Sequence, residues 1–227
     1  MSERTNKERA HALAERSRWA AVLARPGPAA ATPPGVDPEQ FRLALLEDTY
    51  EVLAGLALVR AAVVRYPDDR AELAALTWPG TPLPEVAHST EAGELLAAID
   101  ALAALGASEA VVVAPDAPDL PSLLLGKLFR GLGSAEVSVC PAEGGGLVAL
   151  AARAPAPGWL AAAQVSLDTA DAVARLRAVA PARRAVNVGP SWHRLRAPAD
   201  IARLDPGLEG WEATRLLLTA APQPPRS

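Results

Sequence analysis

Asp116 is the residue of this chain whose position best suits it to chemistry. It lies just beyond Ala110–Ala114, a short β-branched apolar segment that predicts a buried strand. Ligands of open α/β sheets bind at the carboxyl ends of the strands, so a carboxylate here could hold a divalent metal on a nucleotide diphosphate or act as a base. A loop aspartate that caps the backbone or faces solvent is the alternative. Asp119 is expected to cap the helix that starts near Pro121.

Glu143 is the second candidate carboxylate. It precedes three glycines, Gly144, Gly145 and Gly146, between two predicted strands. Because glycine has no side chain, a ligand or another stretch of backbone can approach it closely. A tight hairpin turn has the same composition, and the pattern does not separate a binding loop from a turn.

Two arginine-containing segments are candidates for binding phosphate. Arg25, Pro26 and Gly27 end the first predicted strand, but the loop that follows matches neither the P-loop nor the glycine-rich dinucleotide pattern. Arg194 and Arg196 lie in a basic, aromatic stretch and could grip phosphate. The chain has 20 arginines against 2 lysines, so a solvated face is the alternative for this stretch.

Composition and missing motifs exclude several classes of protein. The 227 residues carry a formal net charge of -4, which gives no basic surface for a nucleic acid. The single cysteine, Cys140, excludes a disulfide framework and a cysteine-based zinc site. No serine-hydrolase elbow or zinc-protease motif is present. No apolar run suits a membrane span, and the charged start does not resemble a signal peptide, so we expect a cytoplasmic protein.

Strands and helices are predicted to alternate along the chain. The alternation predicts a three-layer α/β/α sandwich with a mainly parallel mixed sheet. The two strands around the glycine turn predict one local departure from parallel order. Strands are expected over 19–24, 61–66, 110–114, 135–140, 147–152 and 184–188, and helices over 37–58, 90–105, 121–132, 168–179, 198–204 and 210–219.

One domain is expected over residues 19–220. Residues 1–18 predict a charged helical arm, opened by a capping-box pattern at Thr5 and Glu8. We expect this arm to pack on the domain or on the partner subunit of a homodimer. Residues 221–227 are expected to form a disordered tail.

Taken in order, these segments resemble the bacterial glycosyltransferase-A-like family of the nucleotide-diphospho-sugar transferase superfamily, whose members are often labelled arsenosugar-biosynthesis-type glycosyltransferases. The resemblance covers roughly residues 19–204. The family's Gly-Ser-Asp-Cys-Pro-Asp-Leu segment corresponds to residues 114–120, so the resemblance implies that Asp116 faces the metal or nucleotide. An Asp-Thr pair of the family corresponds to Asp48 and Thr49. The family's Gly-Pro-Ala-Glu-Asp-Gly-Gly-Tyr loop corresponds to residues 140–147 and implies an acceptor loop of Glu143 and Gly144–Gly146.

The chain departs from the family where charges would act. The basic Lys-Thr-Arg-Leu signature is replaced by residues 29–32, Ala-Ala-Ala-Thr, and the aspartate after Glu143 by Gly144. Both aspartates of the late Asp-Val-Asp-Thr-Pro-Glu-Asp-Leu segment are replaced, by Arg194 and Arg196. Exchanging two carboxylates for two guanidiniums changes the local charge by about four units and repels a dication. No metal site is therefore expected, and Mg²⁺ or Mn²⁺ could bind only if Asp116 sufficed.

The resemblance implies a nucleotide or nucleotide sugar as the ligand, at Arg25, Pro26, Gly27, Asp116, Arg194 and Arg196. The first interpretation is a transferase-like protein that is catalytically impaired or independent of metal. The second is an active glycosyl- or nucleotidyltransferase in which Arg194 and Arg196 replace the metal. The third is a non-catalytic interaction or assembly subunit. If Arg25, Pro26, Gly27, Asp116 and Glu143 line an open cavity, ligand binding is favoured. If Arg194 or Arg196 fills that cavity by pairing with Asp116, the third interpretation is favoured.

Overall fold

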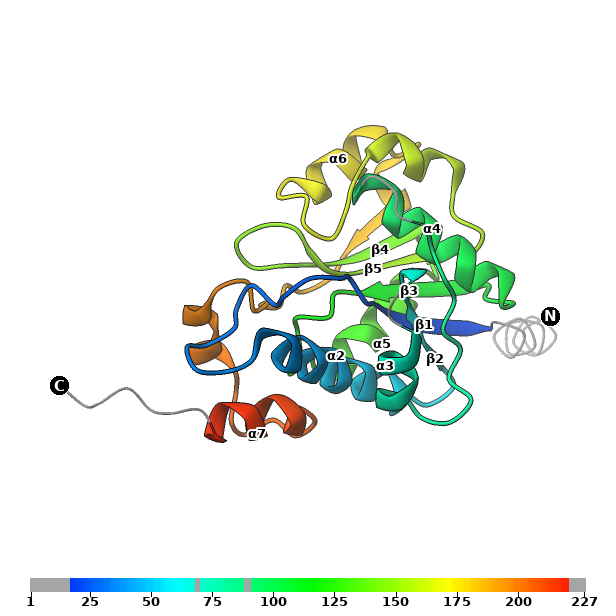
Figure 1. Cartoon of the computed structure of the whole chain (residues 1–227). Helices are drawn as coiled ribbons and strands as arrows, with labels where there is room; N and C mark the ends of the chain where they lie inside the picture. Colours follow the sequence, from blue (N-terminus) through cyan, green and yellow to red (C-terminus); the bar gives the residue numbers. More distant parts are fainter. Residues whose placement is uncertain (1–16, 68–69, 88–90, 221–227) are drawn as a thin grey trace, which may run out of the picture.

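The core of the molecule is a mixed sheet of six strands in the order β2-β1-β3-β5-β4-β6 (Figure 1). The computed structural model describes residues 17–67, 70–87 and 91–220. Strand β1 pairs in parallel with β2 and β3, and β4 pairs in parallel with β6. Strand β5 is antiparallel to both of its neighbours, β3 and β4. The strands are β1 (Arg18–Leu23), β2 (Arg60–Val64), β3 (Glu109–Val113), β4 (Val137–Pro141), β5 (Leu147–Arg153) and β6 (Val186–Val188).

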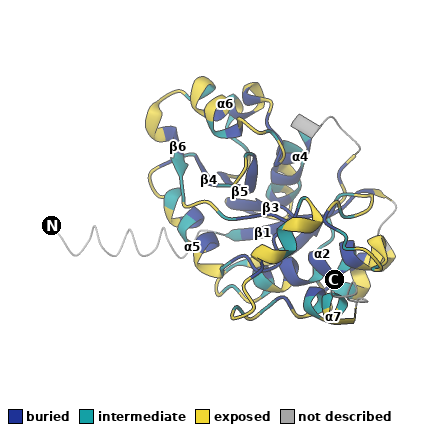
Figure 2. Ribbon diagram, turned by 90° about the vertical axis from the view of Figure 1, so that its left-hand side faces the viewer, coloured by how far each residue is buried: buried dark blue, intermediate teal, exposed yellow. Residues whose placement is uncertain are grey.

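Helices cover both faces of the sheet. Leu95, Ile99 and Leu102 of α4 (Glu91–Ala104) and Leu176 of α6 (Ala172–Val179) share one apolar core with the strands. The other face packs against α2 (Pro38–Ala54), α3 (Arg70–Leu76) and α5 (Ser122–Gly131). Figure 2 shows the strands buried between these two layers. The predicted three-layer α/β/α sandwich with a mainly parallel mixed sheet is confirmed.

The local sequence explains where the first helix begins. The Asp37 carboxylate accepts hydrogen bonds from the backbone N–H groups of Glu39 and Gln40, and Pro38 occupies the first turn. Asp119, in contrast, does not cap α5, so that prediction is wrong. The cap position belongs to Pro121, and the Asp119 carboxylate instead accepts a hydrogen bond from Trp192 Nε1.

A last helix, α7 (Glu212–Ala220), packs on α2 (Figure 1). The buried Asp48 carboxylate of α2 accepts hydrogen bonds from the backbone N–H groups of Ala213 (3.0 Å) and Thr214 (2.8 Å). Burial raises the pKa of Asp48 to about 6, against the lowering effect of these hydrogen bonds. Asp48 therefore joins the two helices, and Trp211, just before α7, completes a third apolar cluster with Phe41 and Leu45.

The sequence did not predict every element. Helix α3 lies between the predicted strand over 61–66 and the predicted helix over 90–105, where no helix is predicted. The described residues also include the 3-10 helices η2 (Gly158–Ala163), η3 (Arg183–Ala185) and η4 (Pro198–Arg203), of which η4 matches the helix predicted over 198–204. No helix in the described part of the chain is long and apolar enough to cross a membrane. The tail over 221–227 and the arm over 1–18, apart from Ser17 and Arg18, lie outside the described residues. The homodimer and the single domain over 19–220 stay predictions.

Candidate functional site

A cavity of about 510 Å³ lies at the edge of the sheet where β1 and β3 end. Strand β5 runs antiparallel to β3, so the same edge holds the start of β5 and the turn before it. The cavity is lined by residues that follow β1, by α2, by the loop after β3, and by two segments near the carboxyl end. The lining residues with charged side chains are Arg25, Arg42, Asp116, Asp168, Arg194 and Arg196.

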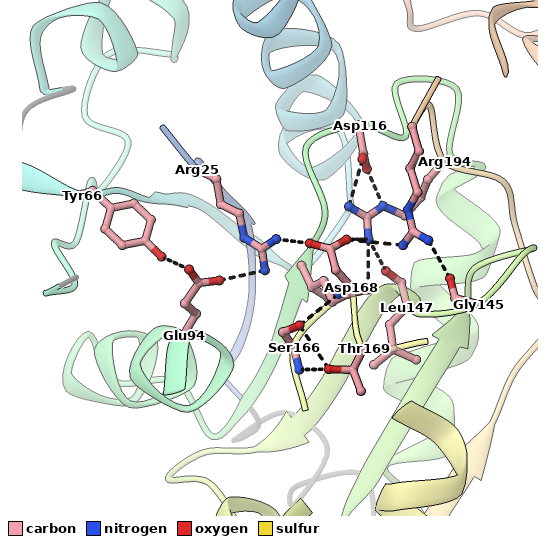
Figure 3. Close-up of polar contacts among 12 residues, drawn as sticks. Arg25, Tyr66, Glu94, Asp116, Gly145, Leu147, Ser166, Asp168, Thr169 and Arg194 are labelled. Carbon is pink, nitrogen blue, oxygen red and sulfur yellow. Dashed lines mark hydrogen bonds and ion pairs between the residues drawn. The ribbon is translucent and has the colours of Figure 1, made fainter. Parts of the chain in front are cut away.

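Arg194 is the most heavily bonded of these side chains. Its Nε and Nη2 donate to the two oxygens of Asp116, at 2.5 and 2.9 Å. Its Nη1 lies 3.1 Å from the carbonyl oxygen of Leu147, 3.0 Å from that of Leu167 and 2.8 Å from Asp168 Oδ1. Only 5% of the Arg194 side chain is exposed. Arg194 thus ties the end of β3 to the start of β5 and to the loop before α6, as Figure 3 shows.

The loop that carries Asp116 is itself fixed in two places. The Thr49 hydroxyl of α2 lies within hydrogen-bonding distance of the Pro115 carbonyl (3.1 Å) and of the Leu45 carbonyl of its own helix (2.8 Å). The backbone N–H of Leu195 donates to the Asp116 carbonyl at 2.8 Å. The Asp48–Thr49 pair singled out by the resemblance therefore has structural contacts. Asp48 joins α7 to α2, and Thr49 fixes the loop that carries Asp116.

Asp168 receives three guanidinium groups. Oδ1 is shared by Arg194 and, at 3.4 Å, by Arg196, and Oδ2 pairs with Arg25. The turn that presents Asp168 is held by its neighbours, because Ser166 N–H donates to Thr169 Oγ1 (2.9 Å) and Asp168 N–H donates to Ser166 Oγ (3.2 Å) (Figure 3). The carboxylate is thus held by cations, while its backbone is held by hydroxyl groups.

A second carboxylate fixes Arg25 from its other side. Arg25 Nη2 lies 2.7 Å from Glu94 Oε2 of α4, and the Tyr66 hydroxyl donates to Glu94 Oε1 at 2.6 Å. A chain of polar contacts therefore runs from Tyr66 through Glu94 and Arg25 to Asp168 and Arg194 (Figure 3).

The pKa shifts follow from this crowding of charges. Burial acts to raise the pKa of Asp168, but Arg194, Arg25 and Arg196 outweigh it and hold that pKa below its ordinary value. Burial acts to lower the pKa of Arg25, but Glu94 and Asp168 raise it above its usual value. Burial and the nearby Arg194 cation lower the pKa of Arg196. The neighbouring carboxylates therefore do not fully offset the effect of burial and of Arg194 on Arg196.

Arg196 is also bonded less completely than Arg194. Its Nη1 donates to the Gly145 carbonyl at 2.8 Å, while its buried Nε has no hydrogen-bond partner among the described residues. About a third of the side chain, 34%, is exposed. The backbone N–H of Arg196 donates to the Asp200 carboxylate at 2.9 Å, so the residue is anchored independently of its guanidinium.

Glu143 and its glycines lie outside the lining of the cavity. The Glu143 carboxylate pairs with Arg203 at the surface, where the Arg203 side chain is 37% exposed and that of Glu143 48%. Gly144, Gly145 and Gly146 form the turn between β4 and β5, and all three have positive φ. Gly146 also permits a close approach, because a Cβ there would lie 2.6 Å from the Leu167 carbonyl oxygen and 2.7 Å from Arg196 Nη2. The tight-turn interpretation therefore accounts for the glycines. They contact the lining of the cavity at Arg196, which bonds the Gly145 carbonyl and packs against Gly146.

The residues present do not form a site for Mg²⁺ or Mn²⁺. Both oxygens of Asp116 are engaged by Arg194, and a hard dication needs several carboxylate or carbonyl oxygens free of competing cations. Within the described ranges no three His, Cys, Asp or Glu side chains are grouped so that they could hold a metal ion. The guanidinium of Arg194 takes the contacts with Asp116 that a cation would make.

The structure thus gathers part of the predicted site. Arg25, Gly27, Asp116, Arg194 and Arg196 line one cavity, whereas Pro26 and Glu143 do not. Sequence reasoning missed Asp168, Glu94, Tyr66 and Arg42. Asp168 was placed at the start of a predicted helix, and the other three belong to predicted helices and a strand. No spacing in the sequence shows that these residues meet, because the contacts join segments far apart in the chain.

Comparison with known proteins gives a family and a fold. A family model described as "Uncharacterized protein conserved in bacteria (DUF2064)" matches residues 49–167, just over half of the chain. The match includes Asp116 and the glycine turn and ends one residue before Asp168. No curated protein sequence matches the chain.

Solved structures are similar over most of the chain. A protein assigned as a nucleotide-diphospho-sugar transferase from Desulfovibrio desulfuricans G20 is 15% identical, with a TM-score of 0.67 over 89% of this chain and 96% of that one. The 4-diphosphocytidyl-2C-methyl-D-erythritol synthase of Anaerococcus prevotii is 11% identical, with a TM-score of 0.60 over 90% and 97%. The bifunctional IspDF of Campylobacter jejuni is 12% identical, with a TM-score of 0.54 over 83% of this chain and 55% of that one. At these identities the likeness shows the fold, which is that of nucleotide-diphospho-sugar transferases.

Proposed function

The chain belongs to the DUF2064 family, and from that premise we propose that it binds a nucleotide or nucleotide sugar at the Arg194 cavity without a divalent metal and has lost metal-dependent transfer. The observation that carries the proposal is the bidentate pair between Arg194 and Asp116. The pair is the contact that the interaction-subunit interpretation expects, and it occupies the carboxylate on which a metal-dependent reaction of this fold would rely. A cavity of about 510 Å³ nevertheless remains beside the pair, and for this reason we favour a ligand. We keep the cytoplasm as the predicted location.

The size and lining of the cavity support a phosphate-containing ligand. Its volume of about 510 Å³ lies within the range typical of small-molecule sites. Guanidinium groups suit phosphate because their planar N–H donors can bond two oxygens at once. The cavity also lies where ligands of parallel α/β sheets bind, beyond the carboxyl ends of the strands.

A metal-independent transferase is the second candidate. The partly exposed Arg196 favours it, since a guanidinium facing the cavity could neutralise a diphosphate leaving group. Arg194 is less suited to that role, because Asp116, Asp168 and two backbone carbonyls already receive most of its N–H donors. The interaction-subunit interpretation predicts that the cavity binds no nucleotide.

Calorimetric titration tests the proposal. Nucleoside di- and triphosphates and nucleotide sugars would each be titrated with Mg²⁺, with Mn²⁺ and with EDTA. We expect at least one to bind with a Kd that EDTA changes less than about twofold, and we expect Arg196→Ala to weaken that binding about tenfold or more. Arg203→Ala is the matched control, because Arg203 pairs with Glu143 outside the cavity.

Two results would contradict this proposal. Binding that disappears in EDTA would show that the ligand needs a divalent metal. The absence of binding by every nucleotide would favour an interaction subunit. Release of a sugar or nucleotidyl group from the bound ligand in EDTA would support the second candidate instead.

A further inference from the structure

The charged groups around the cavity neutralise one another. Arg25, Arg194 and Arg196 face three carboxylates, those of Glu94, Asp116 and Asp168. The remaining cation of the lining, Arg42, pairs with Glu39 of α2 and Glu72 of α3, so it takes no part in this balance. A ligand with two or more negative charges would therefore enter a site whose charge is already balanced, unless one carboxylate moves away.

Asp168 is the carboxylate that can move. Glu94 is buried and receives the Tyr66 hydroxyl, and Asp116 receives two N–H groups of the buried Arg194. The Asp168 side chain is 38% exposed, and its described contacts are with the three arginines alone. Because Ser166 and Thr169 hold the turn through backbone groups, the Asp168 side chain can change its direction while the turn persists.

Two of the three arginines keep their positions without Asp168. Arg25 remains paired with Glu94, and Arg196 remains bonded to the Gly145 carbonyl. Arg194 remains paired with Asp116 and has few N–H donors left for a ligand. Departure of Asp168 would thus expose two oriented guanidiniums, those of Arg25 and Arg196. The buried Nε of Arg196 already lacks a hydrogen-bond partner in the described part of the chain.

We infer that the Asp168 carboxylate is an internal anion that occupies the phosphate position, and that a diphosphate-bearing ligand binds by replacing it at Arg25 and Arg196. This inference rests on the proposed function and adds which group of the ligand the two arginines bind and which side chain competes with it. A diphosphate is favoured over a carboxylate because it brings more charge and more acceptor oxygens to the two guanidiniums. Arg194 acts as a positioning residue that keeps Asp116 and the Leu167 loop together.

Inorganic pyrophosphate is the probe, titrated by calorimetry into the full chain in EDTA. Asp168→Asn keeps the shape of the side chain and removes its charge, so we expect pyrophosphate to bind about tenfold more tightly than to the unmodified chain. Asp171→Asn is the matched control, because Asp171 pairs with Arg175 outside the cavity and the substitution changes the net charge equally. It should leave the Kd within about twofold.

The outcomes separate this inference from the proposed function. If the unmodified chain binds pyrophosphate or a nucleotide but Asp168→Asn leaves the affinity equal or lower, the exchange of Asp168 is overturned and the binding function stands. If neither protein binds pyrophosphate or any nucleotide in the panel, both fail.

A second measurement needs no variant. Nitrogen NMR of the arginine Nε–H groups during pyrophosphate titration should shift the signals of Arg25 and Arg196 and leave that of Arg194 nearly unchanged. A shift of Arg194 without the other two would overturn the assignment, and this result does not depend on whether Asp168→Asn folds.

Discussion

Two arginines separated by one residue have different roles in this molecule. Arg194 is buried and bonded to two carboxylates and two carbonyls, whereas Arg196 is partly exposed and its Nε has no partner among the residues that the structure describes. A sequence that contains twenty arginines cannot distinguish these states, because burial and partners depend on segments distant in the chain. The prediction that both arginines lie at the site is consistent with the lining of the cavity. Their different burial and partners could be seen only in the structure.

The bidentate geometry at Arg194 makes lysine a poor substitute. Arg194→Lys keeps the charge but loses the planar arrangement of donors, so Asp116 and the carbonyls of Leu147 and Leu167 lose partners. We expect the free energy of unfolding to fall by about 3 kcal/mol, as measured by urea denaturation. Arg203→Lys, at an exposed pair, should change it by less than about 0.5 kcal/mol. Equal effects of the two substitutions would refute the positioning role of Arg194.

Among the secondary-structure elements, short apolar strands were the easiest to predict. The segments at β1 and β3 are apolar on both faces, and that pattern suits a strand buried between two helical layers. Helix α3 was missed because the prolines around it indicate a connector, although its own residues, Arg-Ala-Glu-Leu-Ala-Ala-Leu, favour a helix. The Asp119 cap was wrong because distant residues, Trp192 among them, compete for that carboxylate.

The turn between β4 and β5 gives a prediction that separates backbone strain from crowding. Gly144 and Gly146 both have φ near +80°, but only at Gly146 would a Cβ meet other atoms. We expect Gly144→Ala to lower the free energy of unfolding by about 1 kcal/mol and Gly146→Ala by about 2 to 3 kcal/mol. Gly146→Ala should also displace Arg196 and weaken nucleotide binding in calorimetry. If the two alanine variants behave alike, close packing at Gly146 is not important to the site.

For the whole molecule, the packing of α7 on α2 links stability to pH. Burial raises the pKa of Asp48 to about 6, above its ordinary value of 3.8, so the folded state favours the protonated carboxyl. The corresponding stabilisation is complete below about pH 4 and is lost as the pH rises through 6. Relative to Asp48→Asn, the unmodified chain should lose roughly 2 to 3 kcal/mol of unfolding free energy between pH 4 and pH 7. Urea denaturation of both proteins at the two pH values measures this, and a difference that does not change with pH would show that Asp48 is not perturbed.

The connections of Arg194 determine when the site can form during synthesis. All six strands, β1 to β6, precede it in the chain, so the sheet can pair before Arg194 is in place. Until then Asp116 lacks the cation with which it later pairs. The loop after β3 and the loop before α6 also lack the Arg194 side chain that later joins them. The cavity is therefore completed by one of the last segments to be made, and a chain interrupted before residue 194 would hold all six strands of the sheet without a ligand site.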